Sequence, residues 1–193
     1  MLNYHEQRLD EAGIRGNQKS LASHIDDDYN TIELGPGDFH DLAIGGAVTT
    51  YIRAGGSRYS VLSFPVAGAT SSFAFATVRR RSLWVKGLLR CRLFYSGSTG
   101  STNPAKFYAT PKPLALGGLL SAVGANVSAG ISGPAVANAL CEYAYTSYIP
   151  VSAADKTIAV QLVRDKSDAA DTYGGDFYVV MVLLEYLPTV TEA

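Results

Sequence analysis

The sequence predicts an all-β protein: a single jelly-roll-like β-sandwich that follows an extended, mostly irregular N-terminal arm. Three observations favour this fold. The 193 residues are enough for one sizeable hydrophobic core but few for two domains. Strand-forming residues are punctuated by 19 Gly and 8 Pro, together with many Ser and Thr. Runs with the two-residue apolar period of a strand recur from residue 47 onward, and no strong helical period appears beside them.

The first part of the chain differs from the rest, which predicts a division into residues 1–44 (the arm) and residues 45–193 (the sandwich). The arm has few large apolar side chains and many turn formers, such as the run Gly35-Pro36-Gly37. Such a segment cannot bury enough apolar surface to fold alone. Two interpretations stay open: an arm that ties its subunit to neighbours in an assembly, and a disordered leader.

Nine strands are predicted after the arm, separated by Gly-, Ser- and Pro-containing turns. In chain order they are Ala47–Arg53, Tyr59–Phe64, Ser71–Val78, Leu83–Tyr95, Phe107–Pro111, Val123–Ala129, Glu142–Pro150, Thr157–Arg164 and Phe177–Tyr186. In the fourth, the segment 87–95 alternates: Leu89, Cys91, Leu93 and Tyr95 share one face, and Arg90 and Arg92 the other. The small-residue run 117–139 favours loops slightly over closely packed strands.

The two strands nearest the C-terminus organise the predicted core. The first alternates, with Ile158, Val160 and Leu162 on one face. The second is apolar on both faces, so it needs two covers, and a single sandwich core supplies only one. One face is formed by Phe177, Val179, Met181 and Leu183, which makes these residues a candidate subunit interface. The second cover is either more of the same chain or another subunit.

Charge is unevenly divided along the chain. Residues 1–45 hold nine acidic and three basic residues, a net charge of 3 − 9 = −6, and residues 46–193 hold thirteen basic and eight acidic ones, a net charge of 13 − 8 = +5. Such asymmetry indicates that the front segment lies on the basic body of a neighbouring subunit. The candidate docking residues are the triplet Asp26, Asp27 and Asp28 and the basic run Arg79, Arg80 and Arg81. A solvated turn is the alternative for the basic run, and nucleic-acid binding is not expected from one short basic turn without interleaved aromatic residues.

The sequence offers no convincing catalytic, cofactor-binding or metal-binding constellation. The three histidines, His5, His24 and His40, all lie in the arm. The start of a calcium loop at Asp26 fails later, because Thr31 stands where the turn glycine belongs. Four aspartates, Asp165, Asp168, Asp171 and Asp176, lie between the last two strands. They could hold a hard cation or act as catalytic carboxylates, but turn residues that accept their own backbone N–H groups are favoured.

Other classes of segment are not expected. Two cysteines, Cys91 and Cys141, do not make a disulfide framework and are predicted to be buried free thiols. The N-terminus lacks the basic and apolar regions of a signal peptide. The uncharged run Pro113–Cys141 is interrupted by too many Gly, Ser, Asn and Pro residues for a spanning helix, so no membrane association is predicted.

Several motifs resemble a module found in virion proteins of tailed bacteriophages. They cover about half of the chain and hold no catalytic motif. In order they are Leu83-Trp84 with Gly87, an Arg-rich strand ending Phe94-Tyr95-Ser96, Val163-Arg164-Asp165, the acidic turn from Asp168 to Tyr173, Gly175-Asp176, and Leu184-Glu185-Tyr186. The long segment 117–139 and the acidic arm are not part of the shared pattern, so they leave open which virion part this would be.

The resemblance implies a β-sandwich or jelly-roll structural component of a phage head or tail, commonly a trimer. The leading hypothesis is therefore a non-enzymatic capsid decoration (cement) protein: a homotrimer located in the virion, which binds the major capsid protein or other virion proteins and needs no cofactor. The alternative is a receptor-binding module of the tail or fibre that recognises host surface glycans. Its sugar-binding surface would use Tyr143, Tyr145, Tyr148 and Tyr173, for which half-buried strand positions are the favoured interpretation. A glycan hydrolase that uses the carboxylates of residues 165–176 is a more distant third.

Overall fold

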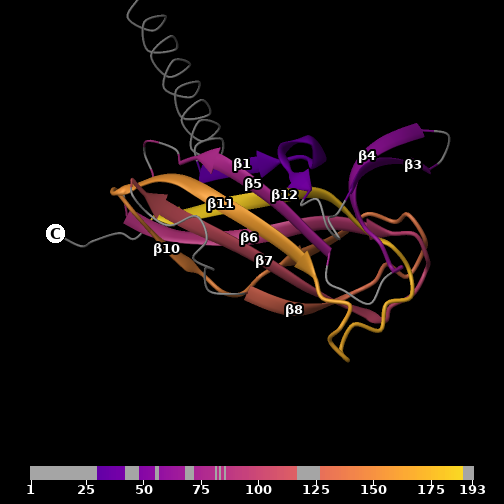
Figure 1. Ribbon diagram of the computed structural model, residues 1–193. Coiled ribbons are helices and arrows are strands. Elements are labelled where there is room, and N and C mark those ends of the chain that lie inside the picture. Colours follow the sequence, from indigo (N-terminus) through magenta and orange to yellow (C-terminus); the bar gives the residue numbers. More distant parts are fainter. Residues whose placement is uncertain are drawn as a thin grey trace, which may run out of the picture.

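Two antiparallel sheets packed face to face make up the described part of the molecule (Figure 1). The computed structural model describes residues 30–41, 48–54, 57–67, 72–80, 82, 84, 86–116 and 127–188. Within them the chain forms twelve strands and one short 3₁₀ helix, η1 (Pro36–Asp38). The architecture is a jelly-roll β-sandwich, which confirms the predicted fold class. Among the described residues, no helix is long and apolar enough to cross a membrane.

The larger sheet is centred on two long strands, β6 and β12, which pair with each other along most of their lengths. On the edge of β6 that faces away from β12, β9 and β10 pair with β6 one after the other. On the edge of β12 that faces away from β6, β4 and β1 pair with β12 in the same way. A further strand, β3, pairs with β4. The bounds are β1 (Thr31–Leu34), β3 (Val48–Ala54), β4 (Ser57–Phe64), β6 (Lys86–Gly97), β9 (Cys141–Ala144), β10 (Ile149–Ser152) and β12 (Phe177–Pro188).

The smaller sheet has the order β2-β5-β11-β7-β8 and every pair in it is antiparallel. Its central strand, β11, is followed by a long turn and then by β12 of the other sheet, so the chain crosses between the sheets at this turn. The bounds are β2 (His40–Asp41), β5 (Ser72–Arg79), β7 (Pro104–Ala115), β8 (Val127–Ser132) and β11 (Asp155–Arg164).

All nine predicted strands are present, with shifted ends and one division. The predicted strand Glu142–Pro150 is two strands, β9 and β10, both paired with β6. Between them the Tyr145 amide donates a hydrogen bond to the Cys91 carbonyl oxygen, at 3.0 Å, while the Tyr145 side chain is buried in the core. The chain therefore bends where an aromatic side chain enters the core.

The predicted boundary between residues 44 and 45 is placed too late. Residues 31–34 form β1 on β12, and residues 40–41 form β2 on β5, so the sandwich includes both. Leu34 and Phe39 are buried in the core. The composition of the first 44 residues conceals these two short strands because their few apolar residues are diluted by turn formers. Residues 1–29 lie outside the described part.

Alternation along β6 and β11 is as predicted. Leu89, Cys91 and Leu93 are buried on one side of β6, and Ile158, Val160 and Leu162 are buried on one side of β11. Apolar side chains from the two sheets meet as a single core. Many of the aromatic rings in this core contact one another. Phe64, Phe107, Tyr95, Phe177 and Tyr173 form a chain of ring contacts, and Trp84 stacks on Tyr186 with ring centroids 5.0 Å apart.

A β-bulge in β12 corrects the predicted subunit-interface face. Val179 lies opposite Tyr95 and Met181 opposite Phe94, so Val180 is an extra residue. The bulge exchanges the two faces, so that Phe177 and Val179 point into the core while Met181 and Leu183 point away from it. Grouping all four residues on one face was wrong because strict alternation cannot anticipate an inserted residue.

Candidate functional site

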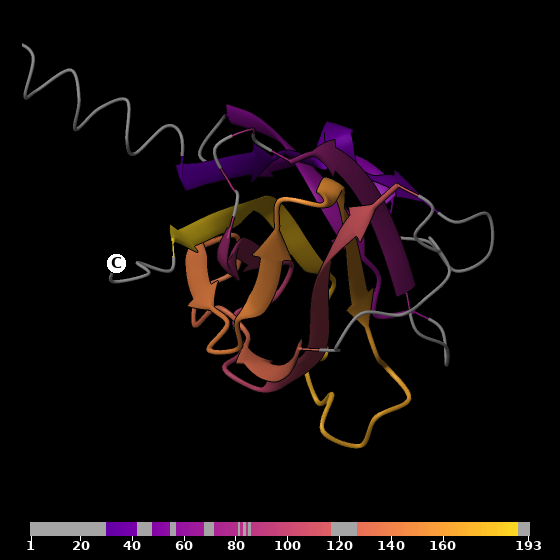
Figure 2. The ribbon, with the colours of Figure 1, turned by 90° about the vertical axis from the view of Figure 1, so that its left-hand side faces the viewer.

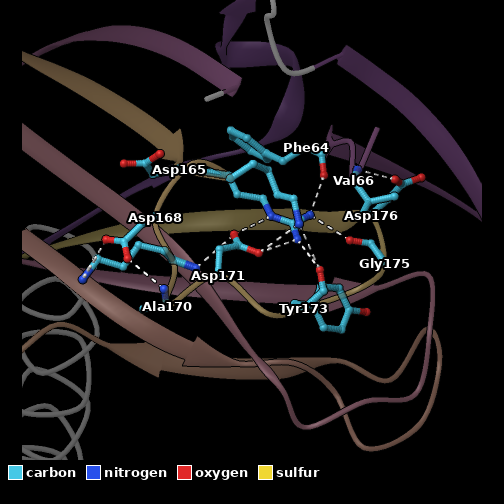
Figure 3. Close-up of polar contacts among 12 residues, drawn as sticks. Phe64, Val66, Asp165, Asp168, Ala170, Asp171, Tyr173, Gly175 and Asp176 are labelled. Carbon is cyan, nitrogen blue, oxygen red and sulfur yellow. Dashed lines mark hydrogen bonds and ion pairs between the residues drawn. The ribbon is translucent and has the colours of Figure 1, made fainter. Parts of the chain in front are cut away.

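The turn between β11 and β12, residues 165–176, is where the sequence places the acidic cluster. Asp165 accepts hydrogen bonds from the Ser167 amide, at 3.1 Å, and from the Ser167 hydroxyl, at 2.6 Å. Asp168 accepts one from the Ala170 amide at 2.8 Å (Figure 3). In both cases an aspartate caps the backbone two residues later. The prediction that these aspartates are turn residues is confirmed for this pair.

Asp176 ties the end of the turn to the larger sheet. Its Oδ1 accepts a hydrogen bond from the Val66 amide at 2.8 Å, just after β4. Its own amide donates to the Ser98 hydroxyl at 2.8 Å, and the Ser98 amide donates to its carbonyl oxygen at 3.0 Å. The carboxylate therefore joins residues more than one hundred positions apart in the chain.

Asp171 has no exposed side-chain surface and forms an ion pair with the equally buried Arg164, the last residue of β11. Arg164 Nε donates to Asp171 Oδ2 at 3.0 Å, and Nη2 donates to Oδ1 at 3.1 Å. The remaining guanidinium hydrogens donate to the carbonyl oxygens of Phe64, Gly175 and Tyr173, at 3.2, 2.7 and 2.7 Å. All five donors of the guanidinium are used (Figure 3), which is what a fully buried cation requires.

The surroundings of this ion pair complete its hydrogen bonding. The Lys106 amide and the Lys166 ammonium also donate to Asp171, at 3.1 and 3.2 Å. The Tyr173 ring lies 5.5 Å from the guanidinium carbon, and its hydroxyl donates to the Thr99 carbonyl oxygen at 2.8 Å. Asp171 thus accepts four hydrogen bonds inside the protein, and its carboxylate stabilises the conformation of the turn.

These bonds decide what the acidic cluster can do chemically. Each of the four aspartates has a carboxylate oxygen bonded to a group of the same chain. Among the described residues no group of three or more His, Cys, Asp or Glu side chains could hold a metal ion. We therefore interpret the turn as a structural clamp that joins β11, β7 and β4 at one end of the sandwich.

A cysteine nucleophile is also disfavoured by its environment. Cys91 is buried, and burial raises the pKa of its thiol to about 12, with the nearby Glu185 carboxylate adding to the effect. At neutral pH this thiol stays protonated. Cys141 is only half-buried, so the prediction of a buried free thiol is confirmed for Cys91 alone, although both cysteines are free.

The predicted tyrosine surface does not form. Tyr145 and Tyr173 have 1% and 0% of their surface exposed, and Tyr143 is half-buried with its ring edge against Tyr145. Burial raises the pKa of Tyr145 well above its ordinary value, which is typical of a core phenol. Of the four, only Tyr148 is largely accessible, at 45%. The favoured prediction of half-buried strand positions is confirmed for Tyr143 alone, because Tyr145 and Tyr173 are fully buried and lie outside the strands.

Met181 and Leu183, the remaining candidate interface residues, are half-buried on the outer face of the larger sheet. Beside them an ion-pair network crosses three strands. Glu185 pairs with Arg90 at 2.6 Å and with Arg92 at 2.8 Å, and Arg92 also pairs with Glu142. The hydrogen bond from Arg90 to Glu185 raises the Arg90 pKa above its ordinary value. This face therefore presents apolar side chains next to internally compensated charges.

The candidate arm-docking residues are only partly described. Arg79 ends β5 and is exposed. Arg80 donates to the Asp155 carbonyl oxygen at 2.5 Å and to the Trp84 carbonyl oxygen. Arg81 and the triplet Asp26, Asp27 and Asp28 lie outside the described residues, so their pairing stays a prediction.

Sequence reasoning missed the importance of Arg164, although a signal was present. The residue continues the inward alternation of Ile158, Val160 and Leu162, so its side chain was due to enter the core. A buried arginine needs a carboxylate and further acceptors. Asp171, seven residues later in the acidic turn, supplies the carboxylate.

Comparisons with known proteins support the fold. No protein-family model and no curated protein matches this sequence. Among solved structures, the CBM35 carbohydrate-binding module of Cellvibrio japonicus Abf62 superimposes with a TM-score of 0.51 at 11% identity, covering 82% of this chain and 94% of that one. The Cry4Aa toxin of Bacillus thuringiensis gives 0.52 at 8% identity, covering 82% and 24%.

A third structure, the GH26-CBM35 β-(1,4)-mannanase of Podospora anserina, gives a TM-score of 0.51 at 8% identity, covering 84% of this chain and 29% of the mannanase. This chain therefore spans less than a third of the mannanase and toxin chains, but nearly all of the Cellvibrio module. At these identities the likeness concerns the fold alone, and it places the chain among jelly-roll β-sandwiches.

Proposed function

We propose that this protein is a non-enzymatic structural component of a tailed-phage virion, a capsid decoration (cement) protein that works as a homotrimer. Its sandwich would sit on the shell, and the segment before β1 would reach neighbouring subunits. The partners would be further copies of this chain and the major capsid protein. The resemblance of its motifs to phage virion modules motivates this choice among the functions open to a jelly roll.

The observation that carries the proposal is the way in which the N-terminal segment joins the body. β1 pairs with β12 through four consecutive residues, from Thr31 opposite Glu185 to Leu34 opposite Val182. β12 is a central strand of the larger sheet and contributes five side chains to the core. A force on residues 1–29 would therefore act on a strand that is hydrogen-bonded to a central strand of the sandwich. A cement protein that holds neighbouring subunits together would need such a firm attachment.

The outer face of the larger sheet supplies a surface for contacts between subunits. Met181 lies opposite Phe94 in the strand pairing, and Leu183 lies opposite Arg92. All of these side chains are half-buried, so a second copy would remove the remaining apolar surface from water. The ion pairs of Glu185 with Arg90 and Arg92 leave little unpaired charge to desolvate there.

The test combines a truncation with binding to capsids that lack this protein. Deletion of residues 2–28 keeps Asn30, β1 and β2, and should leave the thermal unfolding curve of the sandwich unchanged. Co-sedimentation with capsids should be lost. If the truncated protein is folded and still binds capsids, the N-terminal segment is not needed for capsid binding.

The trimer is tested separately by placing a charge on the outer face. Leu183→Glu should shift the protein from trimer to monomer in analytical ultracentrifugation, because an unpaired carboxylate in a dry contact is costly. Thr157→Glu is the matched control, because Thr157 is also half-buried and lies in β11 of the smaller sheet. A wild-type protein that sediments as a monomer, or a trimer that survives Leu183→Glu, would contradict this interface.

Glycan recognition is the alternative proposal, and it would require a surface other than the predicted tyrosine set. Among the residues whose side chains the structure describes, two tyrosines are suitably accessible, Tyr59 at 50% and Tyr148 at 45%. Their ring faces could stack on sugar rings. A glycan array probed with the wild-type protein and with Tyr148→Ala distinguishes the two functions: binding that disappears in the variant would favour a receptor-binding module.

A further inference from the structure

The end of the sandwich opposite the acidic turn gathers strand ends from both sheets. β5 ends there, β6 and β11 begin there, and β12 reaches its last residue, as the left-hand side of Figure 1 shows. The backbone pairings agree: Arg79 lies opposite Thr157, and Pro188 lies opposite Gly87. β1 also begins at this end, because Thr31 pairs with Glu185 near the end of β12. Figure 2 looks onto this end and shows β1 beside the final residues of β12.

Four cationic residues converge here, and we call them the basic end: Arg79, Arg80, Lys86 and Lys156. They belong to adjacent segments. The Arg80 amide donates to the Lys156 carbonyl oxygen at 3.0 Å, and the Arg80 guanidinium donates to the carbonyl oxygens of Asp155 and Trp84. Lys86 lies opposite Ser152, whose amide and hydroxyl donate to Asp155 at 2.7 and 3.0 Å.

Arg79 and Lys156 are exposed, so an anionic partner can reach both side chains. The Lys156 ammonium donates to a neutral acceptor, the Ala153 carbonyl oxygen, at 3.4 Å. Within the described ranges no ion pair joins Arg79 or Lys156 to a carboxylate. The carboxylate of Asp155, next to Lys156 in the chain, already accepts the two hydrogen bonds from Ser152.

The segment that enters this end of the sandwich is strongly acidic. The triplet Asp26, Asp27 and Asp28 precedes the first residue of β1 by three to five positions. Three residues reach about 10 Å when extended, at about 3.3 Å each. Packed sheets are also separated by about 10 Å, so a carboxylate this close to β1 can reach the end of β5 in the other sheet.

We propose that the basic end is the docking surface for the acidic triplet of the same chain. Carboxylates of residues 26–28 pair with Arg79 and Lys156, so the segment before β1 leaves the sandwich from a fixed point beside the end of β5. This docking belongs to the single chain and does not depend on the virion role proposed above. Because the pairs are at the surface, they weaken as salt shortens the Debye length from about 10 Å at 0.1 M to about 3 Å at 1 M.

Zero-length carbodiimide cross-linking of the full chain tests this proposal. The protein is mixed in equal parts from ordinary and nitrogen-15 cultures, cross-linked at low salt, digested and analysed by mass spectrometry. The expected product joins a residue 26–28 carboxylate to the Lys156 amine, with both peptides carrying the same isotope. Absence of this product would overturn docking within the chain. A product with mixed isotopes in half of the pairs would overturn it too, and would show that the triplet binds a neighbouring copy.

Variants identify the surface and exclude a rival occupant. Arg79→Glu should reduce the cross-link to Lys156 several-fold, and Asp27→Lys combined with Arg79→Glu should restore a cross-link, now between Lys at position 27 and Glu at position 79. The matched control is Asp10→Asn with Glu11→Gln, acidic residues far from β1, which should leave the yield unchanged. The C-terminal residues 189–193, which contain Glu192, follow β12 at the same end. A Lys156 product with Glu192 in place of the triplet would contradict the proposal.

Discussion

The two ends of the sandwich handle charge in opposite ways. At the acidic-turn end, Arg164 and Asp171 are fully buried, and the hydrogen bonds of both are completed by the chain itself. At the basic end, Arg79 and Lys156 are exposed, and Arg80 and Lys156 donate hydrogen bonds to backbone carbonyl oxygens. The first end therefore contributes stability, and the second is available for contacts. Charged side chains that look like a functional cluster in a sequence can therefore serve only to stabilise the fold.

The largest expected effect comes from breaking the buried ion pair. Arg164→Met leaves Asp171 buried without its main partner and should lower the free energy of unfolding by about 3–5 kcal/mol. Denaturant unfolding measures the change. Arg164→Lys, which keeps the charge but loses the planar five-donor fork, serves if the first variant does not fold and should also be clearly destabilised.

The matched control for this ion pair is Asp168→Asn in the same turn. Its carboxylate is partly exposed and lies 3.9 Å from the Lys106 ammonium, so the change should cost at most about 1 kcal/mol. Equal effects of Arg164→Met and Asp168→Asn would contradict the distinction between a buried clamp and a surface turn.

Packing around Tyr173 gives the next largest effect. A Cβ atom on Gly133 would lie 2.2 Å from the Ser101 carbonyl oxygen and 2.4 Å from a Tyr173 ring carbon. Gly133→Ala should therefore lower the melting temperature, at a cost of about 1–3 kcal/mol. Gly174→Ala, in the neighbouring turn, meets no atom within 4 Å and should change stability by less than about 0.5 kcal/mol.

Alkaline pH should destabilise the core around β6. Burial raises the pKa of Tyr95, whose hydroxyl donates to the Ser132 carbonyl oxygen at 2.7 Å, to about 12, and the pKa of Cys91 also to about 12. The unfolded chain releases these protons at lower pH than the folded chain, so stability falls as the pH rises from about 9 towards 12. Unfolding curves at pH 8, 9.5 and 10.5 for the wild type and Cys91→Ala measure this. A wild-type midpoint that stays constant would contradict it.

The smallest effect is expected at the basic end. Arg79→Gln and Lys156→Gln should each change the free energy of unfolding by less than about 1 kcal/mol, because exposed ion pairs contribute little. The same unfolding experiment measures them. A loss as large as that of Arg164→Met would show that the basic end is a structural clamp too.

Alternation of side chains was sufficient to predict most of the sandwich. β6 follows it up to Tyr95, and β11 follows it from Thr157 onward, after an irregularity in its pairing with β7; the inward apolar residues of both were identified correctly. β12 does not, because Val180 is an extra residue in its pairing with β6; on the other edge of β12, β4 pairs before this residue and β1 after it. β1 and β2 escaped prediction because strands of four and two residues carry too little pattern, and long-range pairing alone defines them.

The acidic turn was predicted as a turn, but its role depends on contacts that no local pattern contains. Asp176 bonds the Val66 amide, and Arg164 bonds the Phe64 carbonyl oxygen, both remote in sequence. The tyrosines show the same limit. The favoured prediction for Tyr145 and Tyr173 was a half-buried strand position, yet both lie outside the strands and are fully buried in the core.

The central proposal, a structural protein of the phage head, is tested most directly by copy number. Quantitative mass spectrometry of purified virions gives the amount of this chain relative to the major capsid protein. A trimeric decoration protein that covers the shell should be nearly as abundant in virions as the major capsid protein. A few copies per virion would move the protein to the tail or fibre, and its complete absence from virions would contradict the virion role.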